Sequence, residues 1–148
     1  LGIGWGDTLH AAVLKLPRLY RRGDSVAIAA AAACFDHDAH DVRSAAVQAL
    51  TLLAERGDQA AKSAIIGRLE DYKAEVRQAA LAALPAVTAK DDEAACTAVL
   101  ARLVDGNPTV RCCALITLPR LASRGHRPAI KAALRSLEDN SLEVRRAA

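Results

Sequence analysis

The sequence predicts an all-α solenoid built from antiparallel helix pairs, and three observations lead to this prediction. The dipeptide Val-Arg occurs four times at intervals of 34 residues, at Val42-Arg43, Val76-Arg77, Val110-Arg111 and Val144-Arg145. Apolar residues recur at the same interval, as in the column Ala12, Ala46, Ala80, Ala114 and Ala148. Turn residues also recur, in a column that begins with Gly23-Asp24 and Gly57-Asp58. A period of this length, kept in register along the chain, is typical of a solenoid.

Each repeat is expected to hold two helices, because its apolar residues recur at steps of three and four and two polar turns interrupt them. In the second full repeat, Asp58 is placed to cap a helix that runs to about Leu69, and a second helix follows over about residues 74–88. In the third repeat, Asn107-Pro108 predicts a helix start near residue 108. Proline is favoured there because the first helical turn leaves its N–H groups unpaired in any case.

The register divides the chain into one domain of about four repeats. We expect a partial repeat over residues 1–23, full repeats over residues 24–57, 58–91 and 92–125, and a truncated repeat over residues 126–148. A length of 148 residues is ordinary for a single domain. Both ends interrupt the pattern without a polar capping repeat. We therefore expect the chain to be a fragment of a longer array, or its two ends to be covered by end-to-end self-association.

The stretch from Leu69-Glu70-Asp71 through Val76-Arg77 to Ala80 and Leu84 resembles the HEAT-repeat family, specifically its members with short repeats. The resemblance covers nearly the whole chain. It implies a right-handed α-solenoid in which the second helix of each repeat lines the concave side.

The resemblance also implies a ladder in which helix arginines bind turn aspartates. Its members would be Arg43, Arg77, Arg111 and Arg145 together with Asp71, Asp105 and Asp139. A partly buried guanidinium needs fixed acceptors, which a turn aspartate supplies. The first repeat departs from this pattern, because Thr8-Leu9 replaces Val-Arg and His37 stands where aspartate is expected.

The repeats predict a non-catalytic scaffold that binds another protein, since a solenoid acts mainly through the extended surface it presents. The candidate contact residues lie on the second helices and face away from the apolar columns. They form three rows: Ser44, Gln78, Cys112 and Arg146; Gln48, Ala82 and Ile116; and Arg18, Leu52, Ala86 and Arg120. Leu52 and Ile116 are apolar where solvent is expected, which indicates either a partner surface or burial within the fold that the repeat pattern does not show.

Two alternative functions stay open. Bilin lyases and phycobilisome-associated proteins share short HEAT-like repeats, so the handling of a bilin chromophore is the alternative enzymatic function. Binding of an anionic ligand or of nucleic acid is the other, through the basic column Arg22, Arg56, Lys90 and Arg124. Cations near helix C-termini are, however, expected from the helix dipole alone. An aromatic content of 3% also leaves few platforms on which bases stack, so nucleic acid is disfavoured.

No cofactor and no metal site is expected. The four cysteines contain no Cys-x-x-Cys motif, which favours a reduced, intracellular and cytoplasmic protein. His37 and His40 lie among carboxylates in the segment Asp36-His37-Asp38-Ala39-His40-Asp41, a composition that suits a divalent metal. The position of this segment before a helix explains its composition better than a metal does, because acidic residues there cap the helix and interact with its dipole.

We expect neither a membrane span nor a signal peptide. No segment reaches the ~20 apolar residues that a spanning helix needs. The start of the sequence has no basic region before an apolar stretch.

Overall fold

The computed structural model describes residues 4–148, and this part of the chain is helical without any strand. Its α-helices are α1 (Trp5–Leu19), α2 (Ser25–Ala33), α3 (His40–Leu53), α4 (Gln59–Arg68), α5 (Ala74–Val87), α6 (Glu93–Ala101), α7 (Pro108–Leu121), α8 (Arg127–Ser136) and α9 (Leu142–Ala147). Short 3-10 helices, η1 (Cys34–Asp36) and η2 (Arg102–Val104), follow α2 and α6.

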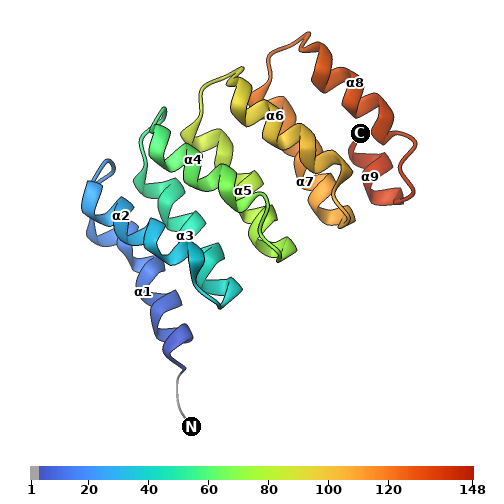
Figure 1. Ribbon diagram of the computed structural model, residues 1–148. Helices are drawn as coiled ribbons and strands as arrows, with labels where there is room; N and C mark the ends of the chain where they lie inside the picture. The colour runs from blue at the N-terminus through green and yellow to red at the C-terminus, as the bar shows by residue number, and fades with distance from the viewer. Residues whose placement is uncertain (1–3) are drawn as a thin grey trace.

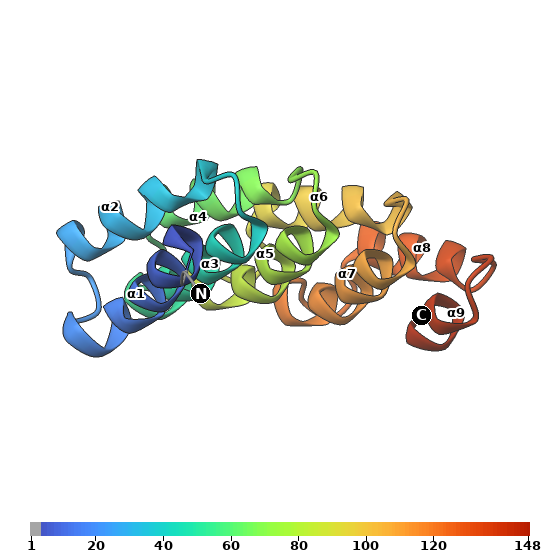
Figure 2. The same ribbon diagram turned by 90° about the horizontal axis from the view of Figure 1, so that it is seen from below.

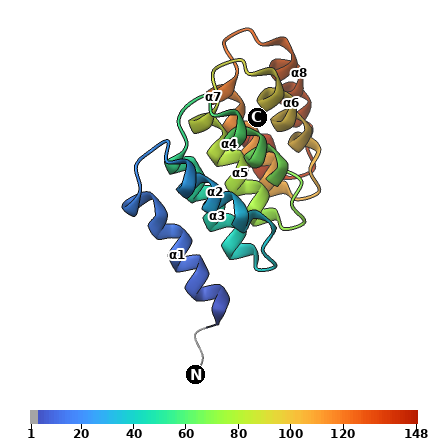
Figure 3. The ribbon, with the colours of Figure 1, turned by 60° about the vertical axis from the view of Figure 1, so that its left-hand side comes forward.

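The helices form two layers. Helices α1, α3, α5, α7 and α9 pack side by side in sequence order, and α2, α4, α6 and α8 form a second row beside them (Figure 1). Seen from below, the two rows form a shallow arc with the odd-numbered helices on its inner side (Figure 2). The helix pairs follow one another along the array from α1 to α8 and α9 (Figure 3). The predicted α-solenoid is therefore confirmed.

The loops that join one repeat to the next share one construction. A residue with positive φ, namely Gly23, Gly57, Asp91 or Gly125, precedes the N-cap of the following outer helix. Three of these residues also donate their backbone N–H to the last carbonyl of the next inner helix: Gly23 to Leu53 (2.7 Å), Gly57 to Val87 (2.9 Å) and Asp91 to Leu121 (2.8 Å). Glycine suits this conformation because it has no Cβ to clash. Each loop therefore ties its own repeat to the next one.

The N-caps explain where the outer helices begin. The carboxylate of Asp58 accepts a hydrogen bond from the N–H of Ala61, as predicted, and Asp24 and Asp92 cap α2 and α6 in the same way. His126 takes this role for α8 through Nδ1. Among the inner helices, the predicted start of α7 is confirmed, with Asn107 as N-cap and Pro108 in the first turn. Such caps stabilise a helix by ~1 kcal/mol each.

The core consists of alanine, leucine and valine between the two layers. Ala46, Ala80 and Ala114 of the repeating alanine column are fully buried, as are Leu50 and Leu84. A methyl side chain lets the backbones of neighbouring helices approach closely, and the larger side chains fill the space between layers. Because every repeat contacts only its neighbours, stability comes from the interfaces between repeats.

We expect Ala80→Phe to overpack one of these interfaces and lower the free energy of unfolding by about 1–3 kcal/mol. Ala82→Phe is the matched control, because Ala82 lies on the same helix but is exposed. Urea unfolding followed by circular dichroism measures both variants. Equal midpoints for the two variants would contradict the burial of Ala80 in an interface between repeats.

Candidate functional site

The predicted contact residues lie on the odd-numbered helices, and we call the surface they form the inner face. Seven of them are exposed: Arg18, Gln48, Leu52, Ala82, Ile116, Arg120 and Arg146. The other four, Ser44, Gln78, Ala86 and Cys112, are half-buried. Leu52 keeps 60% of its surface in solvent and Ile116 keeps 62%. The inner face therefore presents aliphatic side chains in the middle of an otherwise polar and small-residue surface.

A hollow of about 330 Å³ lies on this face between α3 and α5. It brings together three predicted contact residues, Gln48, Leu52 and Ala82, with three residues that the sequence did not single out, Thr51, Ala79 and Ala83. The hydroxyl of Thr51 donates to the carbonyl of Val47 in its own helix (2.7 Å). Its only donor is thus used within its own helix, and four of the six lining residues are aliphatic.

Bidentate ion pairs connect successive repeats along one edge of the array, and we call them the ladder. The guanidinium of Arg43 donates to both carboxylate oxygens of Asp71 (2.8 and 3.1 Å). Arg77 binds Asp105 in the same way (3.0 and 2.9 Å), and Arg111 binds Asp139 (both 2.8 Å). Each arginine therefore reaches the turn of the following repeat.

The remaining nitrogen of each ladder arginine binds the turn of its own repeat. Nη1 of Arg77 donates to the backbone carbonyl of Asp71, and Nη1 of Arg111 donates to that of Asp105 (both 2.7 Å). Arg145 makes the same bond with the carbonyl of Asp139 (2.7 Å). One guanidinium thus holds two successive turns at a fixed distance, because its planar fork allows little adjustment.

The ladder lowers the pKa of its aspartates. Burial on its own raises the pKa of Asp71 and Asp105, but hydrogen bonds from Arg43 and Arg77 and from backbone N–H groups outweigh burial, so that both pKa values fall below the ordinary range. For Asp139, the hydrogen bond from Arg111 is the main cause of the lowered pKa. All three carboxylates are therefore ionised near neutral pH.

The comparison with known families agrees with this architecture. Residues 33–117, more than half of the chain, match the family of HEAT repeats. The chain belongs to the HEAT-repeat family. No curated protein matches it. HEAT repeats generally serve as scaffolds for protein interactions.

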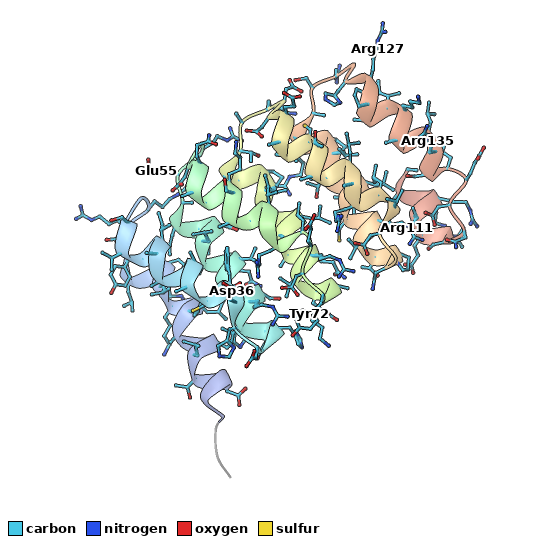
Figure 4. The ribbon with its side chains drawn as sticks, viewed as in Figure 1. Asp36, Glu55, Tyr72, Arg111, Arg127 and Arg135 are labelled. Carbon is cyan, nitrogen blue, oxygen red and sulfur yellow. The ribbon has the colours of Figure 1, made fainter. Side chains whose placement is uncertain are left out.

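The HEAT ladder is modified where the first repeat meets the second. Leu9 occupies the position of the ladder arginine, and Nδ1 of His37 accepts a hydrogen bond from the N–H of Ala39 (3.1 Å). At the following interface, between residues 24–57 and 58–91, the ladder pair is complete: Arg43 also lies over the ring of Tyr72, 4.5 Å from its centroid, and the Tyr72 hydroxyl donates to the carbonyl of Asp38 (3.2 Å). Figure 4 shows Asp36, Tyr72 and Arg111 along this edge, with Glu55 at the opposite edge.

The residues around His37 and His40 show no arrangement that suits a metal ion. Among the residues that the structure describes, no group of three or more His, Cys, Asp or Glu side chains is placed to hold one. The Asp41 carboxylate instead accepts a hydrogen bond from the N–H of Val42 (2.9 Å), at the start of α3. Within residues 4–148, no helix is long and apolar enough to cross a membrane.

Two members of the basic column bind backbone carbonyls of the next repeat. Nη2 of Arg22 donates to the carbonyl of Ala54 (2.8 Å), and Nζ of Lys90 donates to those of Pro119 (3.2 Å) and Ala122 (3.5 Å). These carbonyls lie at the C-terminal ends of α3 and α7, where a cation is favourable. Arg22 and Lys90 thus contribute to repeat packing.

Arg68 and Arg102 are structural residues that the sequence analysis missed. Nη1 of Arg68 donates to the carbonyl of Phe35 (2.7 Å), and Nη1 of Arg102 donates to that of Leu69 (2.9 Å), one repeat back in each case. The two arginines stand 34 residues apart, so the repeat period could have identified them from the sequence. Cys34 and Ser136 occupy the equivalent positions in the neighbouring repeats and interrupt the column.

We expect Asp71→Asn to lower the free energy of unfolding by about 3 kcal/mol, because it leaves the charge of Arg43 buried without its counterion. The side chains of Arg43 and Asp71 are each 3% exposed. Asp36→Asn is the control, since the Asp36 side chain is 91% exposed and its contact with Arg68 is worth little. Chemical unfolding at pH 7 measures both, and similar losses for the two would contradict a structural ladder.

The lowered aspartate pKa values predict loss of stability in acid. As the pH falls below about 4, the unfolded chain takes up protons before the folded ladder does, so the free energy of unfolding decreases. The ladder's contribution is present above the unfolded pKa and is lost as the pH falls through the folded pKa. Unfolding measured from pH 6 to pH 2 should show a shallower slope in Asp105→Asn than in the unmodified protein. Identical slopes would show that Asp105 contributes nothing to acid unfolding.

Proposed function

We propose that this protein is a non-catalytic scaffold that binds another protein through its inner face. The observation that carries the proposal is the hollow between α3 and α5, with Leu52 exposed at its border. Burial of a leucine side chain by a partner contributes ~1.5–3 kcal/mol. Ile116, on α7, extends the aliphatic surface beyond the hollow.

The rigidity of the array supports binding by a preformed surface. The ladder holds the helices at one edge, and the loop N–H groups hold them at the other edge. A surface that keeps its shape loses little conformational entropy on binding, so more of the contact energy appears as affinity.

The chemistry of Cys112 supports a binding role for this face. Burial is the main cause that raises the pKa of the Cys112 thiol, and nearby acidic groups act in the same direction. A thiol with a raised pKa is protonated near neutral pH and is a poor nucleophile. Cys112 thus fits a contact residue better than a catalytic one.

Site-specific photo-crosslinking tests this proposal. A photoreactive amino acid placed at Gln48 in the hollow should form adducts with a small set of proteins in an extract of the source cells. The same amino acid at Ser63, an exposed position on α4 in the outer layer, is the matched control. Leu52→Glu should reduce the Gln48 adducts at least about tenfold, because a partner's apolar side chain would then meet a charge. Adducts that are the same from both positions, or that Leu52→Glu leaves unchanged, would refute the proposal.

A further inference from the structure

We infer that the segment bound on the inner face is an amphipathic α-helix with an aliphatic stripe, acidic residues along one flank and basic residues along the other. This inference rests on the proposed function and adds the form and charge pattern of the partner. It follows from the charged residues around an aliphatic floor, which consists of Leu52, Ala82, Ala86 and Ile116. Basic residues stand at both ends of the row that holds Leu52 and Ala86, and acidic residues lie nearer the N-terminal ends of the inner helices.

The basic border is formed by Arg18 on α1 and Arg120 on α7. Both are exposed, and neither has an ion pair or a side-chain hydrogen bond among the described residues. Leu52 and Ala86 occupy the same row on the two helices between them. An aliphatic segment therefore lies between two unpaired cations, which favours a ligand that supplies carboxylates on this side.

The acidic border lies nearer the N-terminal ends of the inner helices. Asp7 on α1, Glu75 on α5 and Glu143 on α9 are exposed and have no ion pair within the part of the chain that the structure describes. Asp41 on α3 belongs to the same column but is half-buried. A ligand that supplies cations on this side complements the border.

The distance between the borders fits a helix. Glu75 and Ala86 lie eleven residues apart on α5, which corresponds to ~16 Å along the helix axis. A helix with its side chains is ~10–12 Å wide, so its two flanks reach both borders while its middle covers the floor. An extended strand presents side chains only above and below its own plane, and one strand is ~5 Å wide. A strand that points its two sets of side chains at the two borders has no third set left to cover the floor.

The helix dipole explains where these charges lie but does not provide them with counterions. Acidic residues near helix N-termini and basic residues near C-termini are favoured in any case. In this chain, however, ladder arginines such as Arg77 are paired with carboxylates, and Arg22 and Lys90 bind carbonyls. The charges bordering the inner face have no such contact among the described residues, and the same holds for other exposed charges such as Arg127 and Lys131. The position of the border charges around the aliphatic floor is therefore what favours a partner.

Selection from a displayed library of helical peptides tests the inference. From α1 to α7 there are three steps between inner helices of ~8–10 Å each, so a peptide of about 18 residues spans the two basic residues. The library keeps a leucine stripe and varies both flanks among Glu, Gln and Lys. Peptides selected on the unmodified protein should carry Glu on one flank and Lys on the opposite flank, and should gain helical circular dichroism on binding.

Charge reversal of one border gives the sharper result. Arg18→Glu/Arg120→Glu should select peptides with Lys on both flanks and should bind the first set at least about tenfold more weakly at low salt. The control is the double variant Arg127→Glu/Lys131→Glu, which changes exposed residues of α8 and alters the net charge by the same amount. It should select the same peptides as the unmodified protein.

The outcomes separate this inference from the proposed function. In one outcome, Leu52→Glu releases the selected peptides, yet the peptides show no preference for flank charge or bind without gaining helicity. Either result overturns the inference and leaves the scaffold proposal standing. If Leu52→Glu releases none of the selected peptides, both are overturned. Thermal unfolding of every variant confirms that the array remains folded.

Discussion

The fixed distance between successive repeats is the constraint on which the rest of this structure depends. A helix pair alone cannot bury its apolar face, so each repeat is stable only against its neighbours. Two sets of contacts maintain the distance, one at each edge of the array. At one edge the fork of Arg77 binds two successive turns, and at the other the N–H of Gly57 binds the last carbonyl of α5. The alanine columns between these edges allow the inner helices to approach closely without strain.

This division of roles separates the repeating residues, which hold the array together, from the residues that form the inner face. Val76 and Arg77 face the core and the ladder, and their equivalents do so in the other full repeats. The inner face is formed by residues that differ between repeats, such as Gln48, Ala82 and Ile116. Repetition sets the geometry of the surface, and the departures from repetition give it a chemical pattern.

The sequence predicted the helices well because their ends are marked locally by caps and by residues with positive φ, as at Asp58 and Asn107. The alignment of the repeats could not show which aspartate each arginine binds. Asp71, in the same repeat as Arg77, and Asp105, in the following repeat, are equally good candidates from the sequence. In the structure the carboxylate comes from the following repeat, 28 residues ahead, and the repeat's own turn contributes a carbonyl. The hollow was missed because it depends on the spacing of α3 and α5, which no single residue encodes.

The position of the hollow within the ladder connects stability to binding. The most deeply buried ion pair, Arg43 with Asp71, joins the first turn of α3 to the turn before α5, and Tyr72 covers its guanidinium. At the other end of the same two helices, the N–H of Gly57 binds the carbonyl of Val87. The two walls of the hollow are thus held together at both ends. Rigid walls keep this small aliphatic site open, because the lining cannot collapse to fill it, and Leu52 lies exposed at its border.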